Sequence, residues 1–279
     1  MHCPTPTIRW ISEEYVSDRL AFRIGRCESE LFAEFPEAGT LVANERSGVG
    51  RFVPVQGADP VLVGKIEHGL VPALLRQLKG KLALHAATAA CNGRAVACFG
   101  ASHSGKSTAV AELCARPGVE LVADDATALE LRDDRAEVVP TDSEHWLWPA
   151  SCEALGVGDT STLKIPVAAS AAARSPARLV ALCSLVFVDG LERPELIALR
   201  GHALVQSLVG ALIRLVIDNP ERQVTEFEQM TTLAARARVY ELRRARDLGR
   251  LRETGDILEG LLRSGDPAER SGILPCTGA

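Results

Sequence analysis

The chain has 279 residues, 47% hydrophobic and 24% charged, which is the composition of an ordinary globular protein with a sizeable core. Its formal net charge of −5 disfavours nucleic acids and anionic membranes as partners. No apolar stretch reaches the ~18–20 residues of a membrane span, and the first residues carry no apolar signal segment. The eight cysteines form no C-x-x-C pair and several lie in apolar runs, which predicts buried thiols in a reducing, cytoplasmic compartment.

The first part of the chain has the pattern of a small β-rich unit. Residues 8–63 alternate short apolar runs with Gly, Pro, Glu and Asn, which is typical of short strands joined by turns. Residues 71–78 then place apolar side chains at helical spacing around Pro72, a residue suited to a first helical turn. We therefore expect residues 1–80 to form a β-rich unit and a linking helix.

The next segment predicts a hairpin. Residues 82–90 and 94–99 are β-compatible runs separated by Asn92-Gly93, a strong signal for a two-residue turn, so they should pair antiparallel and enter the main sheet. A Gly- and Ser-rich turn follows, and then a helix is expected over residues 106–115 and a buried strand over residues 119–123. The order of elements is strand, loop, helix, strand.

Four further elements are predicted in the rest of the chain. The patterns predict a central strand, a helix, a short strand and a closing helix over residues 179–188, 201–217, 238–242 and 257–262. The tail from Ser264 is expected to be disordered. Seven arginines near the C-terminus are interleaved with acidic residues, which favours a solvated helix face; they are Arg236, Arg238, Arg243, Arg244, Arg246, Arg250 and Arg252.

The turn after the hairpin carries a phosphate-binding motif. Its eight residues match G-x-x-x-x-G-K-[ST] between a predicted strand and a predicted helix; this P-loop motif is Gly100, Ala101, Ser102, His103, Ser104, Gly105, Lys106 and Ser107. Backbone N–H groups of the loop and of the helix start, as far as Thr108, can surround phosphates. Lys106 can reach the β- and γ-phosphates of ATP, and the Ser107 hydroxyl can bind Mg²⁺. The alternative, a Gly/Ser turn with a surface lysine, does not account for the flanking elements.

A pair of acids, Asp124-Asp125, follows the strand over residues 119–123 and lies 18 residues after Lys106. A parallel strand beside the P-loop strand would place both carboxylates at the same sheet edge as the motif. One can hold Mg²⁺ and the other can accept a proton from an incoming hydroxyl. Asp125 is taken as a metal ligand beside Ser107, although the sequence does not separate the two roles. The alternative is that these aspartates only cap the next turn.

Three stretches together resemble a known family. Leu84-His85-Ala86-Ala87, the P-loop motif and Leu121-Val122-Ala123-Asp124-Asp125 resemble the catalytic domain of HPr kinase/phosphorylase and its relatives, with phosphoenolpyruvate carboxykinase as a more distant likeness. Trp146-Leu147-Trp148-Pro149 also looks like the related kinases. The resemblance implies an α/β P-loop kinase core of the HPr kinase C-terminal-domain type, with a mixed sheet, over residues 81–263.

The same resemblance implies an activity. It predicts a kinase that uses ATP and Mg²⁺ to phosphorylate a serine hydroxyl on a peptide or small protein. Whether the kinase forms a homo-oligomer stays open at this point. By position, Lys106 and Ser107 keep the roles given above, one of Asp124 and Asp125 becomes the base, and His85 lies near them as a further catalytic candidate. Without the resemblance, a lone strand histidine is more often a structural residue.

Two departures narrow the expectation. His103 stands where the family usually has glycine, which is able to adopt a positive φ at little cost. The E-[IV]-R-G signature of true HPr kinases is absent after Asp125, which argues against HPr as the substrate and favours relatives that act on ribosomally made peptides. Glu144 or Glu153 is a candidate to replace the missing acid, and Lys164 and Arg200 are candidates for further positive charge.

Two other functions share these residues. A kinase of a small metabolite would differ only in its acceptor pocket, which the sequence does not reveal. A non-enzymatic, nucleotide-dependent peptide-binding module would need Lys106 but would tolerate loss of the acid pair.

Overall fold

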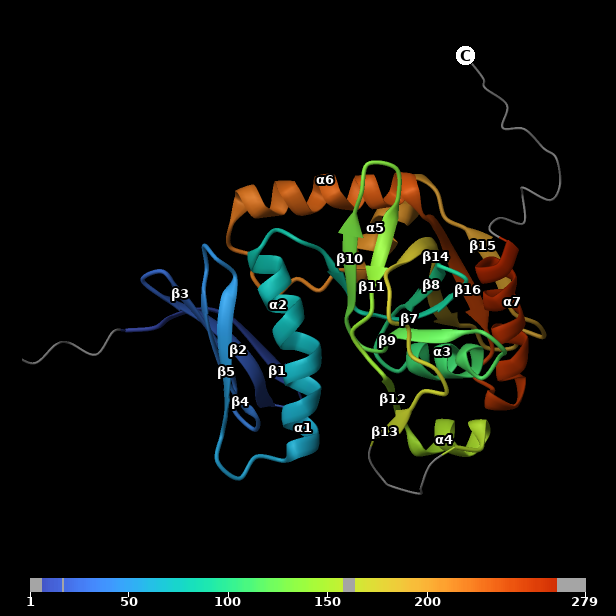
Figure 1. The fold of residues 1–279 in the computed structure, drawn as a ribbon, viewed down its shortest axis with the longest axis horizontal. Helices are drawn as coiled ribbons and strands as arrows, with labels where there is room; N and C mark the ends of the chain where they lie inside the picture. Colours follow the sequence, from blue (N-terminus) through green and yellow to red (C-terminus); the bar gives the residue numbers. More distant parts are fainter. Residues whose placement is uncertain (1–6, 17, 158–163, 265–279) are drawn as a thin grey trace, which may run out of the picture. The chain divides into compact units, whose positions relative to one another are not determined.

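The computed structural model of the protein describes residues 7–16, 18–157 and 164–264 (Figure 1). The predicted disordered tail therefore lies, beyond Ser264, outside the described residues. The chain divides into two compact units: the first runs to Ala83 and also includes Leu212–Gln229, and the second contains Leu84–Ala211 and the chain from Met230 onward. The sequence-based boundaries differ, because they place residues 212–229 in the catalytic domain.

The first unit is an antiparallel sheet with a long helix. Its five described strands follow one another in chain order across the sheet: β1 (Arg9–Val16), β2 (Arg19–Cys27), β3 (Glu30–Phe35), β4 (Gly39–Asn44) and β5 (Val49–Pro54). Strands β3 and β4 bury every second side chain, as expected for a sheet with one covered face. Leu31, Leu41 and Phe35 pack in one core with Leu74 and Leu78 of the helix.

The helix of this unit is longer than the sequence indicated. It consists of α1 (Pro60–Lys65), the π-helical segment η1 (Ile66–Leu70) and α2 (Val71–Leu78) in succession. Asp59 caps its start by accepting a hydrogen bond from the Val61 amide, with Pro60 in the first turn. Pro72 thus lies inside the helix, and the π-helical segment that precedes it accommodates the missing N–H of the proline.

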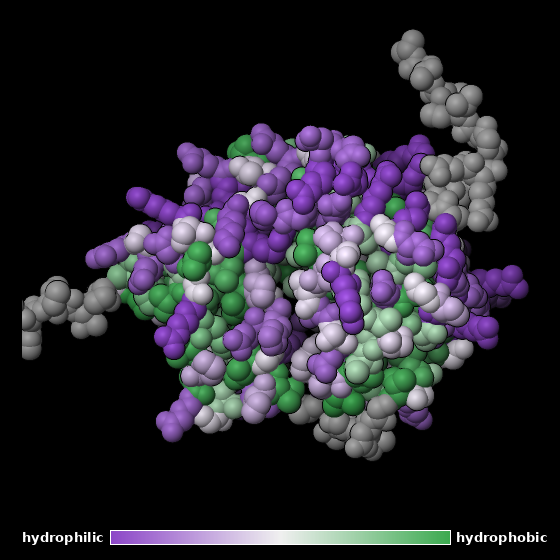
Figure 2. All heavy atoms as spheres, in the orientation of Figure 1, coloured by the Kyte–Doolittle hydropathy of each residue, from purple (hydrophilic) through white to green (hydrophobic). Residues whose placement is uncertain are grey.

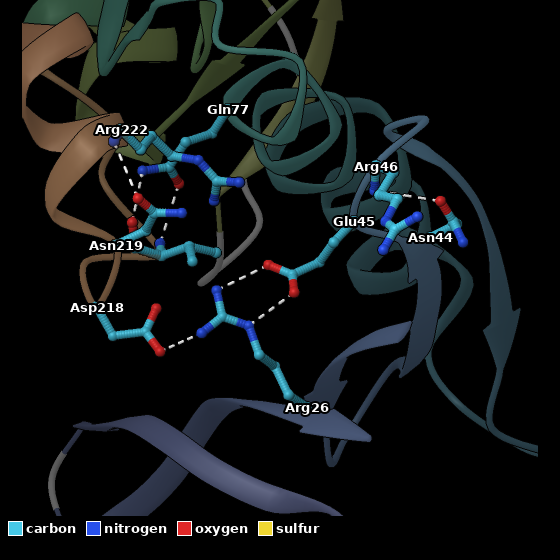
Figure 3. Close-up of polar contacts among 9 residues, drawn as sticks. Arg26, Asn44, Glu45, Arg46, Gln77, Asp218, Asn219 and Arg222 are labelled. Atoms are coloured by element: carbon cyan, nitrogen blue, oxygen red, sulfur yellow. Dashed lines mark hydrogen bonds and ion pairs between the residues drawn. The ribbon is translucent and has the colours of Figure 1, made fainter. Parts of the chain in front are cut away.

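Residues 212–229 are tied to the rest of the first unit by polar contacts (Figure 3). The Arg26 guanidinium donates to both carboxylate oxygens of Glu45, at 2.8 and 2.7 Å, and also pairs with Asp218. The Gln77 side chain accepts hydrogen bonds from the Leu215 and Val216 amides, each at 3.0 Å, and donates to the Val216 carbonyl. A segment far along the chain therefore completes this unit.

The helix α6 (Pro220–Arg236) was not predicted from the sequence. Asn219 accepts a hydrogen bond from the Arg222 amide and Pro220 occupies the first turn, which together are a helix-start signal. Most of its side chains are exposed, and Figure 2 shows mainly hydrophilic residues over this helix. The helix has few apolar residues, so the sequence shows no clear helical spacing of apolar side chains.

The second unit contains a mixed sheet, so an α/β architecture with a mixed sheet is confirmed. Nine described strands form it, in the order β6-β10-β11-β14-β8-β7-β9, with β16 added to β14 and β15 added to β16. Strand β14 runs parallel to both β8 and β16, and the other registered pairs in this sheet are antiparallel. The strands are β6 (Ala83–Leu84), β7 (Ala86–Cys91), β8 (Arg94–Phe99), β9 (Glu120–Ala123), β10 (Thr127–Leu131), β11 (Ala136–Val139), β14 (Ala177–Phe187), β15 (Glu195–Ala198) and β16 (Arg238–Arg244).

Helices and a small ribbon surround this sheet. Helices α3 (Lys106–Cys114) and α7 (Leu251–Ser264) pack together in the main core with β7, β8, β14 and β16. Strands β12 (Glu144–Leu147) and β13 (Ile165–Ala168) form a two-stranded ribbon beside α4 (Pro149–Leu155). Helix α5 (Gly201–Ala211) ends six residues before the predicted end at residue 217, because amides that follow it bind Ala83 and Gln77 instead of continuing the helix.

The predicted hairpin is confirmed, and one predicted adjacency is wrong. Asn92 and Gly93 both have positive φ, at 52° and 73°, which closes a two-residue turn between β7 and β8. Strand β9 pairs with β7 and not with β8, so the strand that precedes the acid pair is not next to the P-loop strand. Since β7 is antiparallel to both neighbours, β9 still points the same way as β8.

Among the described residues, no helix is long and apolar enough to cross a membrane. The predicted burial of thiols is confirmed for Cys91, Cys98, Cys114, Cys152 and Cys183, whereas Cys27 is only partly buried. Burial raises the pKa of the Cys98 thiol to about 12, so it stays protonated near neutral pH.

Candidate active site

The P-loop motif connects the end of β8 to the start of α3, as the sequence predicted. Gly100 has a φ of 140°, and a Cβ there would lie 2.8 Å from the Leu185 carbonyl oxygen of β14. Gly105 has a φ of 81°, and a Cβ there would collide with the Arg244 guanidinium. Both glycines are therefore required by backbone conformation and by close packing.

Lys106 lies over the loop that precedes it. Its Nζ donates to the Gly100 and Ala101 carbonyl oxygens, at 3.1 and 3.2 Å. Burial lowers the pKa of Lys106, with Lys164 acting in the same direction, while Asp125 and Asp124 oppose the shift. The lysine is thus a desolvated cation within the electrostatic field of both predicted acids.

The start of α3 has the features of an anion site. Gly105 precedes the helix and offers no side-chain cap, so nothing of that kind covers the amides of the first turn. Ser107 is half-buried in this turn. The Thr108 hydroxyl hydrogen-bonds to the Ser151 hydroxyl of α4, at 2.8 Å, which leaves the backbone N–H of Thr108 as its contribution to a phosphate site.

His103 occupies the left-handed region with a φ of 64°. Glycine, which the resembled family usually has at this position, adopts such a positive φ at little cost. The imidazole is exposed and lies 5.4 Å from the Trp148 ring, measured between centroids, with the planes tilted by 30°. Histidine is one of the residues that tolerate this region. The contact with the Trp148 ring offsets part of the remaining conformational cost.

The two predicted acids occupy different environments. Asp124 is fully buried; its Oδ2 accepts a 2.6 Å hydrogen bond from the Trp146 amide, and its Oδ1 has no hydrogen-bond partner. Asp125 is about one-third exposed, and its Oδ1 lies 3.7 Å from Nε2 of His85. An incoming molecule can therefore reach Asp125 and His85, whereas the Asp124 side chain is closed to solvent.

The surroundings of Asp124 include residues that the sequence did not single out. His145 Nδ1 lies 3.9 Å from Asp124 Oδ1, and both groups are buried. Asp142 Oδ2 accepts hydrogen bonds from the Asp124 amide, at 3.1 Å, and from the Thr141 hydroxyl, at 2.9 Å. Burial raises the pKa of Asp142, and the nearby Asp124 and Asp125 add to the shift. No spacing rule connects Asp142 to Asp124; the fold brings them together.

Comparison with known proteins gives a distant likeness of fold to solved structures. No family model matches this chain, and no curated protein matches it. The solved structure of the HPr(Ser) kinase/phosphatase from Coxiella burnetii matches over 64% of this chain and 96% of its own chain, with 16% sequence identity and a TM-score of 0.35. The function proposed below therefore depends on the geometry of the site.

The weaker candidates lie mostly at the periphery. Glu144 and Glu153 are exposed, as are Arg200 and its neighbours at the start of α5. Lys164 is close enough to Lys106 to affect its pKa, so it adds positive charge to this region.

The predicted setting of the arginine-rich segment is wrong. The arginine-rich segment was predicted to be a solvated helix face, but Arg238, Arg243 and Arg244 lie on strand β16 and Arg244 is buried. The strand pattern of residues 238–242 was recognised, yet the arginines that flank its apolar positions were judged by charge alone. The Arg244 Nη2 donates to the Ser104 carbonyl oxygen, at 2.8 Å, so this residue supports the P-loop motif from below.

The residues present fit a metal that is shared with a nucleotide. Within the described chain, no group of three or more His, Cys, Asp or Glu side chains is arranged to hold an ion by itself. Mg²⁺ is commonly held by one or two protein oxygens together with substrate phosphates. The Ser107 hydroxyl and the partnerless Asp124 Oδ1 or the accessible Asp125 carboxylate are suitable oxygen donors.

Proposed function

We propose that this protein is an ATP-dependent kinase that transfers the γ-phosphate to a serine hydroxyl of a peptide or small protein. The observation that carries the proposal is the common direction of β8 and β9: β8 leads into the P-loop motif and β9 leads into Asp124-Asp125. In open α/β sheets, ligands bind outside the carboxyl ends of such strands. The coupling of Lys106 to both aspartates supports this arrangement.

The roles of the P-loop residues follow from their positions. The uncapped amides at the start of α3 bind the phosphates, and Lys106 exchanges its contacts with the Gly100 and Ala101 carbonyls for contacts with phosphate oxygens. Ser107 and one of the aspartates hold Mg²⁺, which when bound neutralises charge on the β- and γ-phosphates.

The two aspartates divide the remaining work. Asp125 is accessible and lies beside His85, so it is suited to accept the proton of the incoming serine hydroxyl. The serine oxygen then forms a bond to the γ-phosphorus, the bond between that phosphorus and the bridging oxygen breaks, and ADP leaves. Asp124, with its buried Oδ1, is suited to the metal side of the site. The sequence-based prediction made Asp125 the metal ligand, whereas this assignment gives that role to Asp124.

The acceptor class rests on the sequence resemblance to kinases of ribosomally made peptides. His85 and Asp125 lie at the surface, which suits an acceptor presented on a peptide or protein. A kinase of a small metabolite would use the same nucleotide residues, and a peptide-binding module would use them without transfer. These alternatives are outcomes of the experiment below.

The test follows labelled γ-phosphate from ATP to serine-containing peptides over a Mg²⁺ series, with mass spectrometry to locate the modified residue. Asp125→Asn should lower transfer by ~10²–10⁴-fold while ATP binding survives, because an amide cannot accept the proton. Asp124→Asn should lower transfer and raise the Mg²⁺ requirement, because a neutral amide is a poorer ligand for a hard cation. Asp189→Asn, at an exposed turn, serves as the control.

Wild-type transfer by both site variants would show that neither carboxylate takes part in the chemistry. Label that appears only in small metabolites would replace the serine acceptor by a metabolite. Binding of ATP and peptide without any transfer by the wild-type protein would favour the binding module.

A further inference from the structure

One large aromatic side chain is exposed beside the P-loop motif. Trp148 is 42% exposed, although Leu147 before it is 1% exposed and packs in a small core with Ala111 of α3 and Cys152 of α4. Among the described residues of the second unit, no other Trp, Tyr or Phe is exposed to this extent. A single exposed apolar residue needs no explanation by itself, so its position decides what it means.

The chain on both sides of Trp148 is fixed to the two parts of the candidate site. Before it, the Trp146 amide donates a 2.6 Å hydrogen bond to Oδ2 of Asp124. After it, the Ser151 hydroxyl hydrogen-bonds to the Thr108 hydroxyl in the first turn of α3, at 2.8 Å. Trp148 therefore belongs to a short segment that joins the acid pair to the start of α3.

The start of α4 fixes the backbone of Trp148. Its carbonyl oxygen accepts hydrogen bonds from the Ser151 and Cys152 amides, at 2.9 and 3.0 Å, and Pro149 restricts the next position. The indole lies 5.4 Å from the imidazole of His103, between ring centroids, with the planes tilted by 30°. A flat ring thus already contacts the indole at the edge of the phosphate-binding loop.

A nucleotide bound to the P-loop motif brings a second flat ring to this region. Backbone amides of such a loop and of the helix that follows it surround the α- and β-phosphates, and the nucleoside is attached to the α-phosphate. The nucleoside therefore leaves the loop near the first turn of α3, where Thr108 contacts α4. Nucleobases stack on aromatic side chains because every base has an apolar π-face.

We propose that the exposed part of the Trp148 indole binds the base of the nucleotide by stacking. This inference rests on the proposed nucleotide-dependent function, and it adds the part of the site that distinguishes a nucleoside triphosphate from its phosphates alone. The fixed backbone and the rigid ring mean that Trp148 loses little conformational entropy when the base binds.

The test compares ATP with inorganic tripolyphosphate, which carries phosphates and no base, by isothermal titration calorimetry of the full chain with Mg²⁺. Trp148→Ala should lower the affinity for ATP by roughly 5- to 150-fold, the usual contribution of base stacking on an aromatic ring, and leave tripolyphosphate affinity unchanged. Trp148→Phe keeps a ring and should retain most of the ATP affinity. Phe227→Ala removes an exposed ring from the first unit, so this control should bind both ligands as the wild-type protein does.

Tryptophan fluorescence gives a second readout of the same contact. ATP should quench the emission of the wild-type protein and tripolyphosphate should not, because only a stacked base contacts the indole. Trp148→Phe retains Trp10 and Trp146, and in this variant the quenching should disappear while ATP still binds.

Three results would overturn the base site. The first is wild-type ATP affinity in Trp148→Ala. The second is an equal loss of affinity for ATP and for tripolyphosphate, which would mean that Trp148 only supports the structure of the P-loop motif. The third is quenching by a serine-containing peptide and not by ATP, which would assign the ring to the acceptor.

These measurements do not depend on phosphoryl transfer. A preference for ATP over tripolyphosphate that requires Trp148, in a protein that transfers no label, would contradict the kinase proposal and support the base site. Transfer by a wild-type protein whose ATP affinity is unchanged in Trp148→Ala would support the kinase proposal and contradict the base site.

Discussion

At the scale of single residues, His103 shows how the P-loop motif tolerates a substitution for glycine. The residue has a φ of 64°, a conformation that costs an L-residue roughly 1–2 kcal/mol relative to glycine. We expect His103→Gly to bind ATP with Mg²⁺ at least as tightly as the wild-type protein, because the glycine relieves this cost. Isothermal titration calorimetry measures the affinity.

His103→Ala is the matched variant, because it removes the ring and keeps the unfavourable backbone. It should bind ATP more weakly than His103→Gly, since alanine adopts a positive φ less readily. A loss of more than tenfold in His103→Gly would contradict the expectation and would show that the imidazole, held near Trp148, contacts the phosphates itself.

Asp142 predicts a pH dependence of stability. Burial raises its pKa in the folded protein above the ordinary value of 3.8, so folding favours the protonated form. The charged carboxylate therefore destabilises the fold above the raised pKa, and this effect disappears as the pH falls through it. Asp142→Asn keeps an oxygen that can accept from the Asp124 amide and carries no charge.

We expect Asp142→Asn to melt above the wild-type protein at pH 7, by ~2–4 °C for each kcal/mol regained, with a difference that shrinks toward pH 4. Thermal unfolding followed by circular dichroism measures this, with Asp189→Asn as the exposed control. A difference that grows as the pH falls would mean that the charged form of Asp142 stabilises the fold.

At the scale of elements, the hairpin of β7 and β8 positions the site, and its turn can be tested. Gly93 has a φ of 73°, and a Cβ added there would meet no atom within 4 Å. Gly93→Ala should therefore lower the free energy of unfolding by roughly 1–2 kcal/mol through backbone conformation alone. Urea denaturation measures the change.

Gly210→Ala provides a control with the opposite sign. Gly210 lies in α5, has no positive φ and has open space around its Cβ position. The alanine should leave stability unchanged or raise it by up to ~1 kcal/mol, because it restricts the unfolded chain and favours the helix. Equal losses in both variants would show that the left-handed turn is not what Gly93 supplies.

The elements that the sequence predicted are those specified by neighbouring residues. The turn at Asn92-Gly93, the helix after the P-loop motif and the strand at β14 each have a local pattern, and each is confirmed. The insertion of β7 between β8 and β9 depends on which strand edges find partners, and no local pattern encodes that. The length of α1 to α2 was missed because Pro72 was interpreted as a helix start.

The candidate site was likewise predictable only where its residues follow a local pattern. Spacing identified the P-loop motif and the acid pair, and the family resemblance added His85, which does lie beside Asp125. Arg244 and Asp142 come from strands and loops more than a dozen residues away, and only the fold places them against Ser104 and Asp124. The charge of Arg244 favoured solvent exposure, which is wrong because the residue is buried.

At the scale of the whole molecule, the chain leaves its second unit after α5 and returns to the first for residues 212–229. Gln77 fixes this return. Its side chain is 4% exposed and makes hydrogen bonds to the amides of Leu215 and Val216, the Val216 carbonyl and the Glu226 carboxylate. Each of its polar atoms is therefore used twice.

Gln77→Leu should destabilise the first unit by ~3 kcal/mol or more, because several buried groups lose their partner at ~1–3 kcal/mol each. Hydrogen exchange followed by mass spectrometry measures the effect where it arises, with Gln56→Leu in an exposed turn as the control. The peptide that contains Leu215 and Val216 should exchange faster in Gln77→Leu and at the wild-type rate in the control. Unchanged protection of these two amides would mean that the return segment is held by its apolar contacts, such as that of Val216 with the sheet core, and not by Gln77.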